Sequence, residues 1–338
     1  MTGNEGPLIP KNLLIVRTDR LGDVVLTLSM ARALKHANPE FHVSFFARSY
    51  TAPIISHSPD VDQVFIVEDD TSLSKLIHTF RSAKADAAFF PSPQFRLALA
   101  AFLARIPKRI GTGYRWYSFL FTDKIFEHRR TAEHHEAVYN LHMLDRLGIP
   151  WQMEELPRIE LGPEERGTVK EWLAANLNST AFAVLHITNG GSTKRWPVQN
   201  FITLGQKLFE RYAMTIILTG TRQETEELRA TQSAIGTGKA LVFAGCSLPE
   251  LAALLERAAL VMATGTGPGH LAAALGTPTI GIFSLPPAVS KERWSFRGPR
   301  AKNIAPEPIA ECPNCRDCTC MERLEVQTVL DNIATMLS

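Results

Sequence analysis

Residues 261–284 read VMATGTGPGHLAAALGTPTIGIFS, and they predict a strand, a glycine loop, a helix and a second strand in close succession. The strands are expected at residues 259–263 and 279–283, with the helix at about 270–275 between them. The loop from Gly265 to Gly269 permits close backbone approaches and opens onto a helix N-terminus, where free N–H groups and the helix dipole favour an anion such as phosphate. A tight turn without a ligand would use the same residues.

The same alternation of strand and helix extends over the rest of the chain. Apolar runs predict further strands at residues 12–16, 43–47, 63–67, 87–90, 181–186, 215–219 and 240–243. Most gaps between them carry helical periodicity, which is typical of parallel sheets covered on both faces. We therefore expect an α/β chain of two Rossmann-like doubly wound halves.

A proline-rich polar stretch without periodicity, PWQMEELPRIELGPEERG at residues 150–167, separates the two halves. The sequence thus predicts domains at residues 1–155 and 156–310, followed by a cysteine-rich segment and a last helix at 311–338.

Composition excludes several classes of protein. The 338 residues are 45% hydrophobic and 21% charged, with a net charge of +2, as in ordinary globular proteins. No apolar run is long enough for a membrane span, and MTGNEGPLIP lacks the features of a signal peptide, so a cytoplasmic location is expected. No zinc-finger spacing or RNA-binding motif favours nucleic acid.

Asp23 is the first candidate functional residue. It follows Gly22 where a strand's carboxyl end meets a helix, which is the edge where open α/β sheets bind ligands. A helix N-cap would explain the same residue. Downstream, residues 105–130 are rich in Arg, Lys and aromatic side chains, which suits either an anionic substrate or lipid surface, or a solvated face.

Three loops at strand ends of the second half form a second candidate site. The first contains Thr188 and ends at Lys194 just before a helix, the second contains Glu224, and the third is the glycine loop with His270. A lysine and glycine N–H groups suit phosphates, and a carboxylate suits ribose hydroxyls. Taken one at a time, each residue has a simpler interpretation: Lys194 as a surface lysine, Glu224 as a first-turn helix glutamate and His270 as a structural histidine. Together they predict a pocket for a nucleoside diphosphate.

Common alternatives lack their signatures. Neither half has G-x-G-x-x-G after its first strand or an acidic residue about twenty positions on, as a dinucleotide-binding dehydrogenase would have. No P-loop and no G-x-S-x-G motif is present.

In order and spacing, four segments make the chain resemble the lipopolysaccharide heptosyltransferase family, glycosyltransferase family 9, over nearly its whole length. They are LLIVRTDRLGDVVLTLSMARALKHANP, HIT with KRWP, TGTRQE, and AGCSLPELAALLERAALVMATGTGPGHLAAALGTPTIGIF. The resemblance implies a GT-B enzyme, in which two Rossmann-like domains face a cleft. The first domain would hold the acceptor and the second an ADP-sugar, ADP-heptose in this family.

The resemblance also implies roles for residues. Asp23 would be the general base of an inverting transfer. Lys194 and the loop N–H groups would stabilise the leaving diphosphate, so catalysis would need no metal. The implied donor-binding residues are Thr188, Lys194, Glu224, Gly265, Thr266, Gly267 and His270. The acceptor would be an acidic, phosphorylated or Kdo-bearing glycolipid at the cytoplasmic face of the inner membrane, with the enzyme associated peripherally. The implied acceptor-binding residues are Arg17, Arg20, Lys108, Arg109 and Arg115.

Two features depart from the family pattern. Gly265 stands where the family usually has an Asp that contacts the donor sugar, which keeps open another nucleotide sugar or a protein acceptor. Cys312, Cys315, Cys318 and Cys320 form a dense cluster that could ligate structural zinc or iron. A nucleotide-sugar- or metal-binding protein without turnover remains an alternative from another class.

Overall fold

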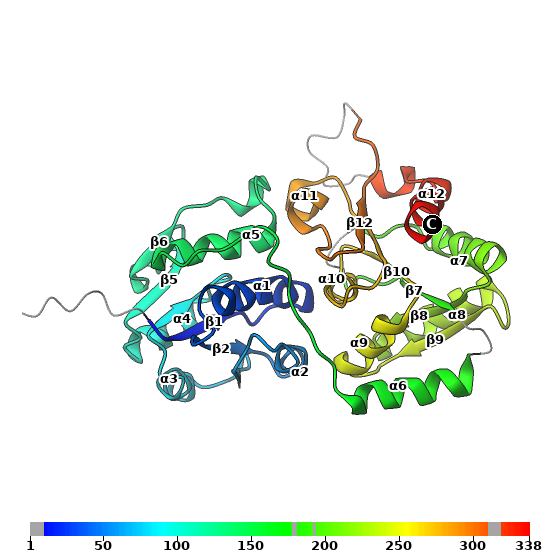
Figure 1. The fold of residues 1–338 in the computed structure, drawn as a ribbon. Coiled ribbons are helices and arrows are strands. Elements are labelled where there is room, and N and C mark those ends of the chain that lie inside the picture. Colours follow the sequence, from blue (N-terminus) through cyan, green and yellow to red (C-terminus); the bar gives the residue numbers. More distant parts are fainter. Residues whose placement is uncertain (1–9, 178–180, 192–193, 310–318) are drawn as a thin grey trace, which may run out of the picture. The chain divides into compact units, whose positions relative to one another are not determined.

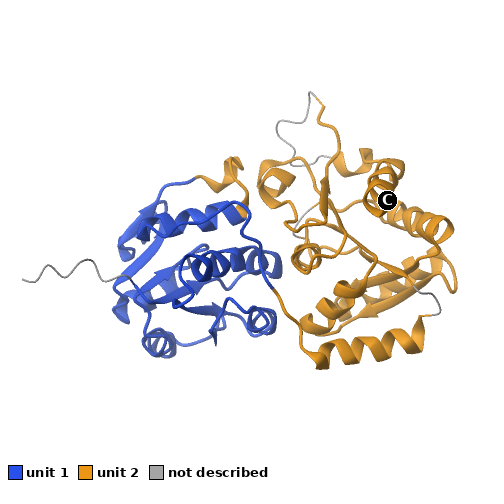
Figure 2. Ribbon diagram, in the orientation of Figure 1, with its two compact units in different colours: residues 1–127, 137–158 blue, residues 128–136, 159–338 orange. Residues whose placement is uncertain are grey.

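The computed structural model describes residues 10–177, 181–191, 194–309 and 319–338. The chain divides into two compact units, which are coloured separately in Figure 2. Unit 1 comprises residues 1–127 and 137–158, and unit 2 comprises residues 128–136 and 159–338. The unit boundary thus lies three residues beyond the predicted one, and a nine-residue segment of the first half groups with the second.

Unit 1 contains a six-stranded parallel sheet in the order β3-β2-β1-β4-β5-β6 (Figure 1). Its strands are β1 (Asn12–Val16), β2 (His42–Ala47), β3 (Gln63–Ile66), β4 (Ala87–Phe89), β5 (Lys108–Thr112) and β6 (Asp123–Ile125). Its helices are α1 (Leu21–Ala37), α2 (Ala52–Ser56), α3 (Leu73–Ser82), α4 (Phe95–Leu103) and most of α5 (Glu136–Leu141). Central β1 is buried along Leu13–Val16, as expected for a parallel strand covered on both faces.

Unit 2 repeats the design in the order β12-β11-β10-β7-β8-β9. The strands are β7 (Phe182–His186), β8 (Thr215–Gly220), β9 (Ala240–Ala244), β10 (Leu260–Thr264), β11 (Thr279–Ile282) and β12 (Ala301–Ile304). The helices are α6 (Pro163–Asn176), α7 (Val198–Tyr212), α8 (Thr225–Ile235), α9 (Leu248–Arg257), α10 (Gly267–Ala274), α11 (Lys291–Trp294) and α12 (Val326–Leu337).

Both sheets reverse their strand order at one point, between β1 and β4 in unit 1 and between β7 and β10 in unit 2. At such a switch point the connections leave in opposite directions, so the loops after the two strands separate and leave room for a ligand. The fold therefore provides one candidate ligand-binding edge in each unit. The prediction of two doubly wound halves is confirmed.

Several elements differ from the predictions, and the short helices α2 and α11 were not predicted. Residues 105–130, which were expected to be a basic loop region, contain β5 and β6. The single helix expected at about 133–147 is instead α5 followed by a 3-10 helix from His142 to Leu147. Strand β12 was not predicted. The missed strands are only three to five residues long and carry charged or glycine positions, so they lack a clear apolar period.

The described end of the chain, residues 319–338, packs into the core of unit 2 and forms no separate segment. Cys320, Met321 and Leu324 are buried in the same apolar cluster as Trp196, whose indole Nε1 donates a hydrogen bond of 2.9 Å to the Leu324 carbonyl. Helix α12 continues this cluster through Val329, Leu330 and Ile333. Across the described residues, none of the helices has the length and apolarity needed to cross a membrane.

Candidate active site

Asp23 lies in the first turn of α1, directly beyond the carboxyl end of β1. The N-cap of α1 is Arg20, and no side chain makes a capping hydrogen bond there. The N-cap interpretation of Asp23 is therefore wrong. Its carboxylate Oδ1 instead accepts a hydrogen bond from Arg17 Nη2, and its side chain keeps 21% of its surface exposed.

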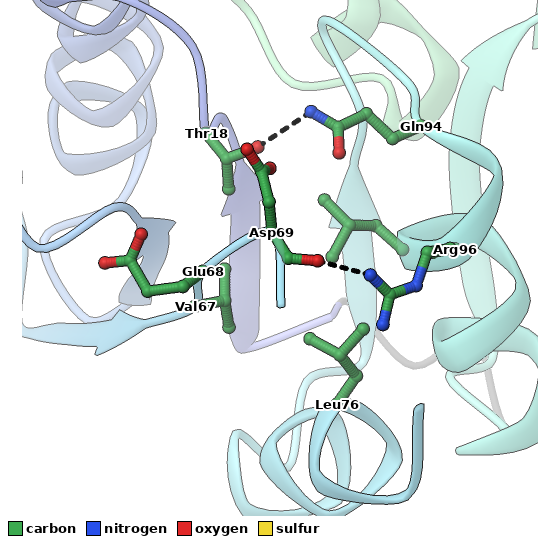
Figure 3. A pocket seen from close by; sticks show the side chains of 8 residues that line it. Thr18, Val67, Glu68, Asp69, Leu76, Gln94 and Arg96 are labelled. Atoms are coloured by element: carbon green, nitrogen blue, oxygen red, sulfur yellow. Dashed lines mark hydrogen bonds between the residues drawn. The ribbon is translucent and has the colours of Figure 1, made fainter. Parts of the chain in front are cut away.

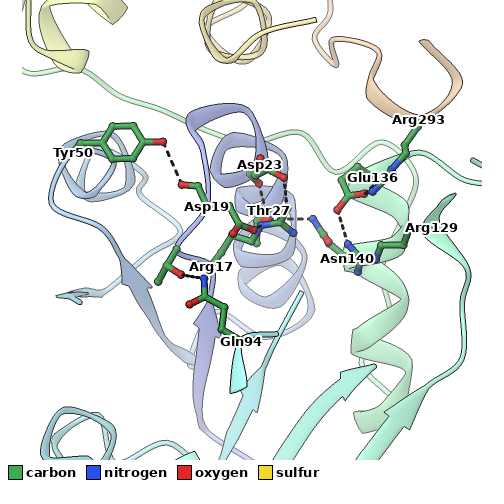
Figure 4. Close-up of polar contacts among 11 residues, drawn as sticks. Arg17, Asp19, Asp23, Thr27, Tyr50, Gln94, Arg129, Glu136, Asn140 and Arg293 are labelled. Carbon is green, nitrogen blue, oxygen red and sulfur yellow. Dashed lines mark hydrogen bonds and ion pairs between the residues drawn. The ribbon is translucent and has the colours of Figure 1, made fainter. Parts of the chain in front are cut away.

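Arg17 is the buried centre of this arrangement. Its side chain is 3% exposed and forms ion pairs with both Asp23 and Asp19, the latter at 2.8 Å from Nε to Oδ2 (Figure 4). A buried guanidinium must be compensated by carboxylates, because leaving it unpaired costs several kcal/mol. This pairing fixes the Asp23 carboxylate in one orientation at the ligand-binding edge.

Helix α1 is itself held in place by polar contacts within unit 1. Thr27 donates to the Asp23 carbonyl at 2.7 Å and accepts from Asn140 Nδ2 of α5 at 3.1 Å. Both side chains are fully buried. The first turn of α1, which carries Asp23, is thus held by the hydrogen bonds of Thr27 as well as by the ion pair with Arg17.

A pocket of about 420 Å³ opens beside Asp23. It is lined by Thr18, Asp19, Arg20, Asp23, Arg48 and Tyr50, from the loops after β1 and β2. A carboxylate that can take a proton and arginines that can meet anionic groups therefore share one cavity.

A second pocket of about 260 Å³ shares Thr18 with the first and lies between the loops after β1, β3 and β4 (Figure 3). Gln94 Nε2 donates to Thr18 Oγ1 at 3.1 Å, which joins the loops on either side of the switch point. Arg96 donates to the carbonyls of Asp69 and Thr71, so its guanidinium holds the β3–α3 loop.

The predicted acceptor-binding residues do not all gather at this edge. Arg20 lines the Asp23 pocket, whereas Arg17 lies beneath Asp23 as its ion-pair partner. Lys108 and Arg109 begin β5 and align through β4 with Leu13 and Leu14 at the start of β1.

These two residues therefore lie at the amino end of the sheet, opposite Asp23, and the structure does not bring them to the Asp23 pocket. Arg109 is also engaged structurally, because its Nε donates to the Leu120 carbonyl at 2.7 Å. Arg115 lies beyond the carboxyl end of β5 and is exposed.

In unit 2, the predicted donor-binding residues follow three adjacent strands. Thr188 follows β7, Glu224 follows β8, and the loop from Gly265 to Gly267 follows β10. Because β10, β7 and β8 are neighbours and parallel, these residues share one sheet edge at the switch point. Lys194, in the loop between β7 and α7, is exposed.

Glu224 forms a capping box with Thr221, whose backbone N–H and hydroxyl both lie within 2.8 Å of Glu224 Oε2. Burial raises the pKa of Glu224, but hydrogen bonds from Thr221 and Thr188, together with the electrostatic interaction with His186, outweigh burial and hold this pKa below its ordinary value. The first-turn interpretation is thus confirmed, and the same group is a stable, oriented carboxylate at the ligand-binding edge.

Several buried polar groups of unit 2 cluster in sequence around the ends of β10 and β11. The hydroxyls of Thr264, Thr266 and Ser284 and the Nδ1 of His270 are buried, and among the described residues they have no hydrogen-bond partner. Buried polar groups are nearly always satisfied, by protein, water or ligand. These groups are free of protein partners among the described residues, so water or a polar ligand at the glycine loop could satisfy them.

His270 is held against aromatic side chains behind this loop. Its ring packs edge-on against Phe296 at 4.8 Å between centroids. A Cβ on Gly269 would come within 2.1 Å of the same Phe296 ring, so the loop requires glycine there for close packing. Burial lowers the pKa of His270 to about 3, with a smaller contribution from His135, so the imidazole is neutral.

A cluster of ion pairs holds residues 128–136 against α11 of unit 2 (Figure 4). Glu136, at the start of α5, accepts hydrogen bonds from Arg129 and from Arg293 of α11, the latter at 3.0 and 3.1 Å. His135 Nε2 lies 2.8 Å from the Ser295 carbonyl. These contacts explain why a segment from the first half of the sequence belongs to unit 2.

Of the four clustered cysteines, only Cys320 lies among the described residues, where it is buried in the core of unit 2. Cys312, Cys315 and Cys318 lie outside them. Within the described residues, no group of three His, Cys, Asp or Glu side chains could hold a metal ion.

Arg48, Tyr50 and Gln94 were not predicted, although the same signal that indicated Asp23 applies to them. Arg48 and Tyr50 come directly after β2, and Gln94 precedes α4 in the loop after β4. Polar residues just beyond each parallel strand are the candidates for the ligand-binding edge.

Comparison with known proteins gives consistent matches. The sequence model of the family described as "Glycosyltransferase family 9 (heptosyltransferase)" matches residues 73–323. A putative glycosyltransferase from Haemophilus influenzae is 24% identical over 90% of this chain and 89% of its own length. Lipopolysaccharide heptosyltransferase 3 from Escherichia coli is 23% identical over 81% of this chain and 84% of its own.

The solved structure of E. coli ADP-heptose lps heptosyltransferase II superposes with a TM-score of 0.80 at 19% identity, covering 96% of this chain and 98% of that one. The likeness over both halves shows the GT-B pair of Rossmann-like domains.

His186 provides a pH-dependent test of the strand end in unit 2. Burial lowers its pKa from 6.5 to about 4, while Nδ1 lies 3.0 Å from Thr219 Oγ1. Because the unfolded chain binds the proton first, stability falls as pH drops from about 6.5 toward 4. For one such histidine, the loss between pH 7 and pH 5 is about 2 kcal/mol.

We expect the free energy of unfolding of His186→Asn, measured by urea titration, to fall less over this interval than that of the wild type, by about that amount. Asparagine keeps a polar atom near the Nδ1 position, so the pH slope rather than the absolute stability is the readout. Equal slopes in both proteins would show that His186 is not buried in neutral form.

Proposed function

The chain belongs to glycosyltransferase family 9, and we propose that it moves a heptose from ADP-heptose to a hydroxyl of a lipopolysaccharide core acceptor, with inversion at the anomeric carbon. The family membership makes it a glycosyltransferase. The finer assignment is supported above all by the Asp23 carboxylate, which Arg17 orients beside a pocket that also contains arginines.

In the proposed reaction, Asp23 removes the proton from the acceptor hydroxyl as its oxygen forms the bond to the anomeric carbon. The bond from that carbon to the diphosphate oxygen breaks on the opposite face, and ADP leaves with the electron pair. A positioned carboxylate base contributes typically about 10² to 10⁴ in rate. The ion pair with Arg17 supports this role because it restricts the carboxylate to one geometry.

The leaving ADP develops negative charge that unit 2 is suited to meet. We propose that Lys194 and the N–H groups at Thr266 and Gly267 stabilise the diphosphate, at the start of α10 where the helix dipole adds to the effect. Glu224 would accept hydrogen bonds from ribose hydroxyls, and Thr188 would lie beside it at the end of β7. The unpartnered hydroxyls of Thr264 and Thr266 support a polar ligand at this place.

The acceptor is proposed to be an acidic glycolipid, and Arg20 and Arg48 of the Asp23 pocket support this chemistry. A lipid-linked acceptor places the reaction at the cytoplasmic face of the inner membrane. Arg17 is left out of the acceptor contacts because it is buried under Asp23.

Gly265 favours a second candidate within the same chemistry. Glycine cannot supply the carboxylate that the family usually offers to the donor sugar at this position. A transferase using another nucleotide sugar, or a protein acceptor, would keep Asp23 and the diphosphate site and differ only in the sugar contacts. A binding protein without turnover would retain nucleotide affinity but show no transfer.

We also propose that Cys312, Cys315, Cys318 and Cys320 hold a structural zinc or iron, since four thiolates are a common set for either metal. Burial of Cys320 in the unit 2 core would tie such a site to the fold. Elemental analysis of anaerobically purified protein should find about one metal per chain, reduced in Cys315→Ser. Metal-free wild-type protein of full stability would contradict this proposal.

Asp23→Asn should lower kcat by about 100-fold or more, because the amide keeps the shape of the side chain but cannot accept the proton. ADP affinity should not change, since the nucleotide contacts lie in unit 2. Asp19→Asn is the matched control, because it also removes a carboxylate from Arg17, and it should cost much less. Transfer by Asp23→Asn at the wild-type rate would refute the mechanism.

ADP should raise the apparent stability of the protein more than UDP, GDP or CDP, by about 2.7 kcal/mol at a concentration of 100 times its Kd. Glu224→Gln should weaken ADP binding in calorimetry, because an amide is a poorer acceptor for two ribose hydroxyls than a carboxylate. Glu250→Gln is the matched control, since Glu250 forms the equivalent capping box with Ser247 at α9.

Equal ADP affinity of the two variants would remove Glu224 from the donor site. A preference for UDP or GDP would favour the second candidate, with another donor.

A further inference from the structure

Unit 1 carries a concentration of exposed aromatic side chains that neither pocket explains. Of the twelve large apolar side chains that are exposed among the described residues, seven fall between residues 95 and 126. We define the aromatic patch as the five aromatic residues of α4 and the β5–β6 region that follow or adjoin the carboxyl ends of these strands. They are Phe95, Tyr114, Trp116, Phe119 and Phe126.

The aromatic patch contains two pairs of rings in contact. Phe95 at the start of α4 packs against Trp116 at 4.8 Å between ring centroids, and Tyr114 packs edge-on against Phe126 at 5.5 Å. Trp116 is 73% exposed and Phe119 is 66% exposed, which is unusual for residues of this size.

These aromatic residues are not needed to fill the core. The same loop already sends Tyr117, Leu120 and Phe121 inward, where they are buried with residues of α4. The exposed aromatic side chains of the patch are therefore additional to the buried apolar side chains that fill the core. A concentration of exposed apolar surface marks an interaction site in soluble proteins.

Exposed basic side chains adjoin the aromatic patch in the sequence. In the sequence, Arg96 follows Phe95, Arg115 precedes Trp116 and Lys124 lies two residues before Phe126, while the acidic neighbours are Glu127 and Asp123, which pairs at 3.9 Å with Lys108. Arg96, Arg115 and Lys124 are exposed, and Arg96 also donates to the carbonyls of the β3–α3 loop. Trp, Tyr and Phe among exposed Arg and Lys are the combination that seats proteins at the interface of an anionic bilayer.

We propose that the aromatic patch docks unit 1 onto an anionic phospholipid membrane, with the aromatic rings in the headgroup region and the basic side chains on the lipid phosphates. A second copy of the chain fits less well as the partner. In a two-fold symmetric contact, the basic side chains of one copy would lie against the same basic side chains of the other and repel them. Membrane docking by the patch does not itself depend on the proposed function. Only its biological purpose, access to a lipid-linked acceptor, rests on that function.

The position of the patch relative to the acceptor site supports this purpose. Phe95 is adjacent to Gln94, which lines the second pocket and hydrogen-bonds Thr18, a residue of both pockets. The patch and the Asp23 pocket therefore lie on the same carboxyl edge of one sheet. Docking there would bring the glycan of a lipid-linked acceptor to the base.

The test is co-sedimentation of the full chain with phosphatidylcholine vesicles that contain or lack phosphatidylglycerol. The wild type should bind the anionic vesicles, and salt should weaken this binding. The double variant Trp116→Ser/Phe119→Ser should bind at least about tenfold more weakly. The control Ile66→Ser, at a 56% exposed residue on the opposite sheet edge, should bind like the wild type.

Charge reversal gives a second, independent pair of variants. Lys124→Glu on β6 should weaken binding to anionic vesicles by about fivefold or more, whereas Lys170→Glu on α6 of unit 2 should not. Transfer to a water-soluble core oligosaccharide should be the same in Trp116→Ser/Phe119→Ser as in the wild type, which also shows that the variant folds.

Failure of the wild type to bind anionic vesicles while it still transfers to the soluble acceptor would overturn the membrane proposal and leave the proposed function intact. Unchanged vesicle binding by the double variant would also overturn it. So would a dimer in light scattering that the double variant abolishes, because a second copy would then cover the patch. Vesicle binding lost in the double variant, in a protein without transfer activity, would support the docking surface alone.

Discussion

The reversal of strand order in each parallel sheet is the constraint on which the candidate site depends. Where the connections after β1 and β4, or after β7 and β10, leave toward opposite faces, the backbone cannot close over the sheet edge. Each unit uses this gap differently. Unit 1 places a carboxylate beside arginines, and unit 2 places glycines and unpartnered hydroxyls at a helix start.

Within unit 1, the buried Arg17 determines how the gap is used. A guanidinium that is 3% exposed needs its two carboxylate partners, and both come from the loop and first turn that follow β1. The positive charge of Arg17 thus both stabilises the loop after β1 and orients the Asp23 carboxylate. Stability and positioning depend here on the same contacts, so a neutral residue at position 17 would affect both.

The sequence was sufficient to predict the two doubly wound halves and the residues that lie at the carboxyl edge of each sheet, such as Asp23 and Glu224, because apolar periodicity and the carboxyl-end rule are local signals. It was not sufficient for β5, β6 and β12, which are short and interrupted by charge or glycine. Lys108 and Arg109 were predicted to bind the acceptor because residues 105–130 were interpreted as a loop region, whereas these two residues begin strand β5. The partner of Asp23 could not be predicted either, since which basic residue is buried beneath a loop is decided by tertiary packing.

The most direct measurement is the anomeric configuration of the glycoside formed from ADP-heptose and a core oligosaccharide acceptor, determined by NMR on the product of the wild-type protein. A single displacement with Asp23 as base predicts a configuration opposite to that of the donor. Retention of configuration would contradict it, because retention requires either a covalent intermediate or attack from the face of the leaving group.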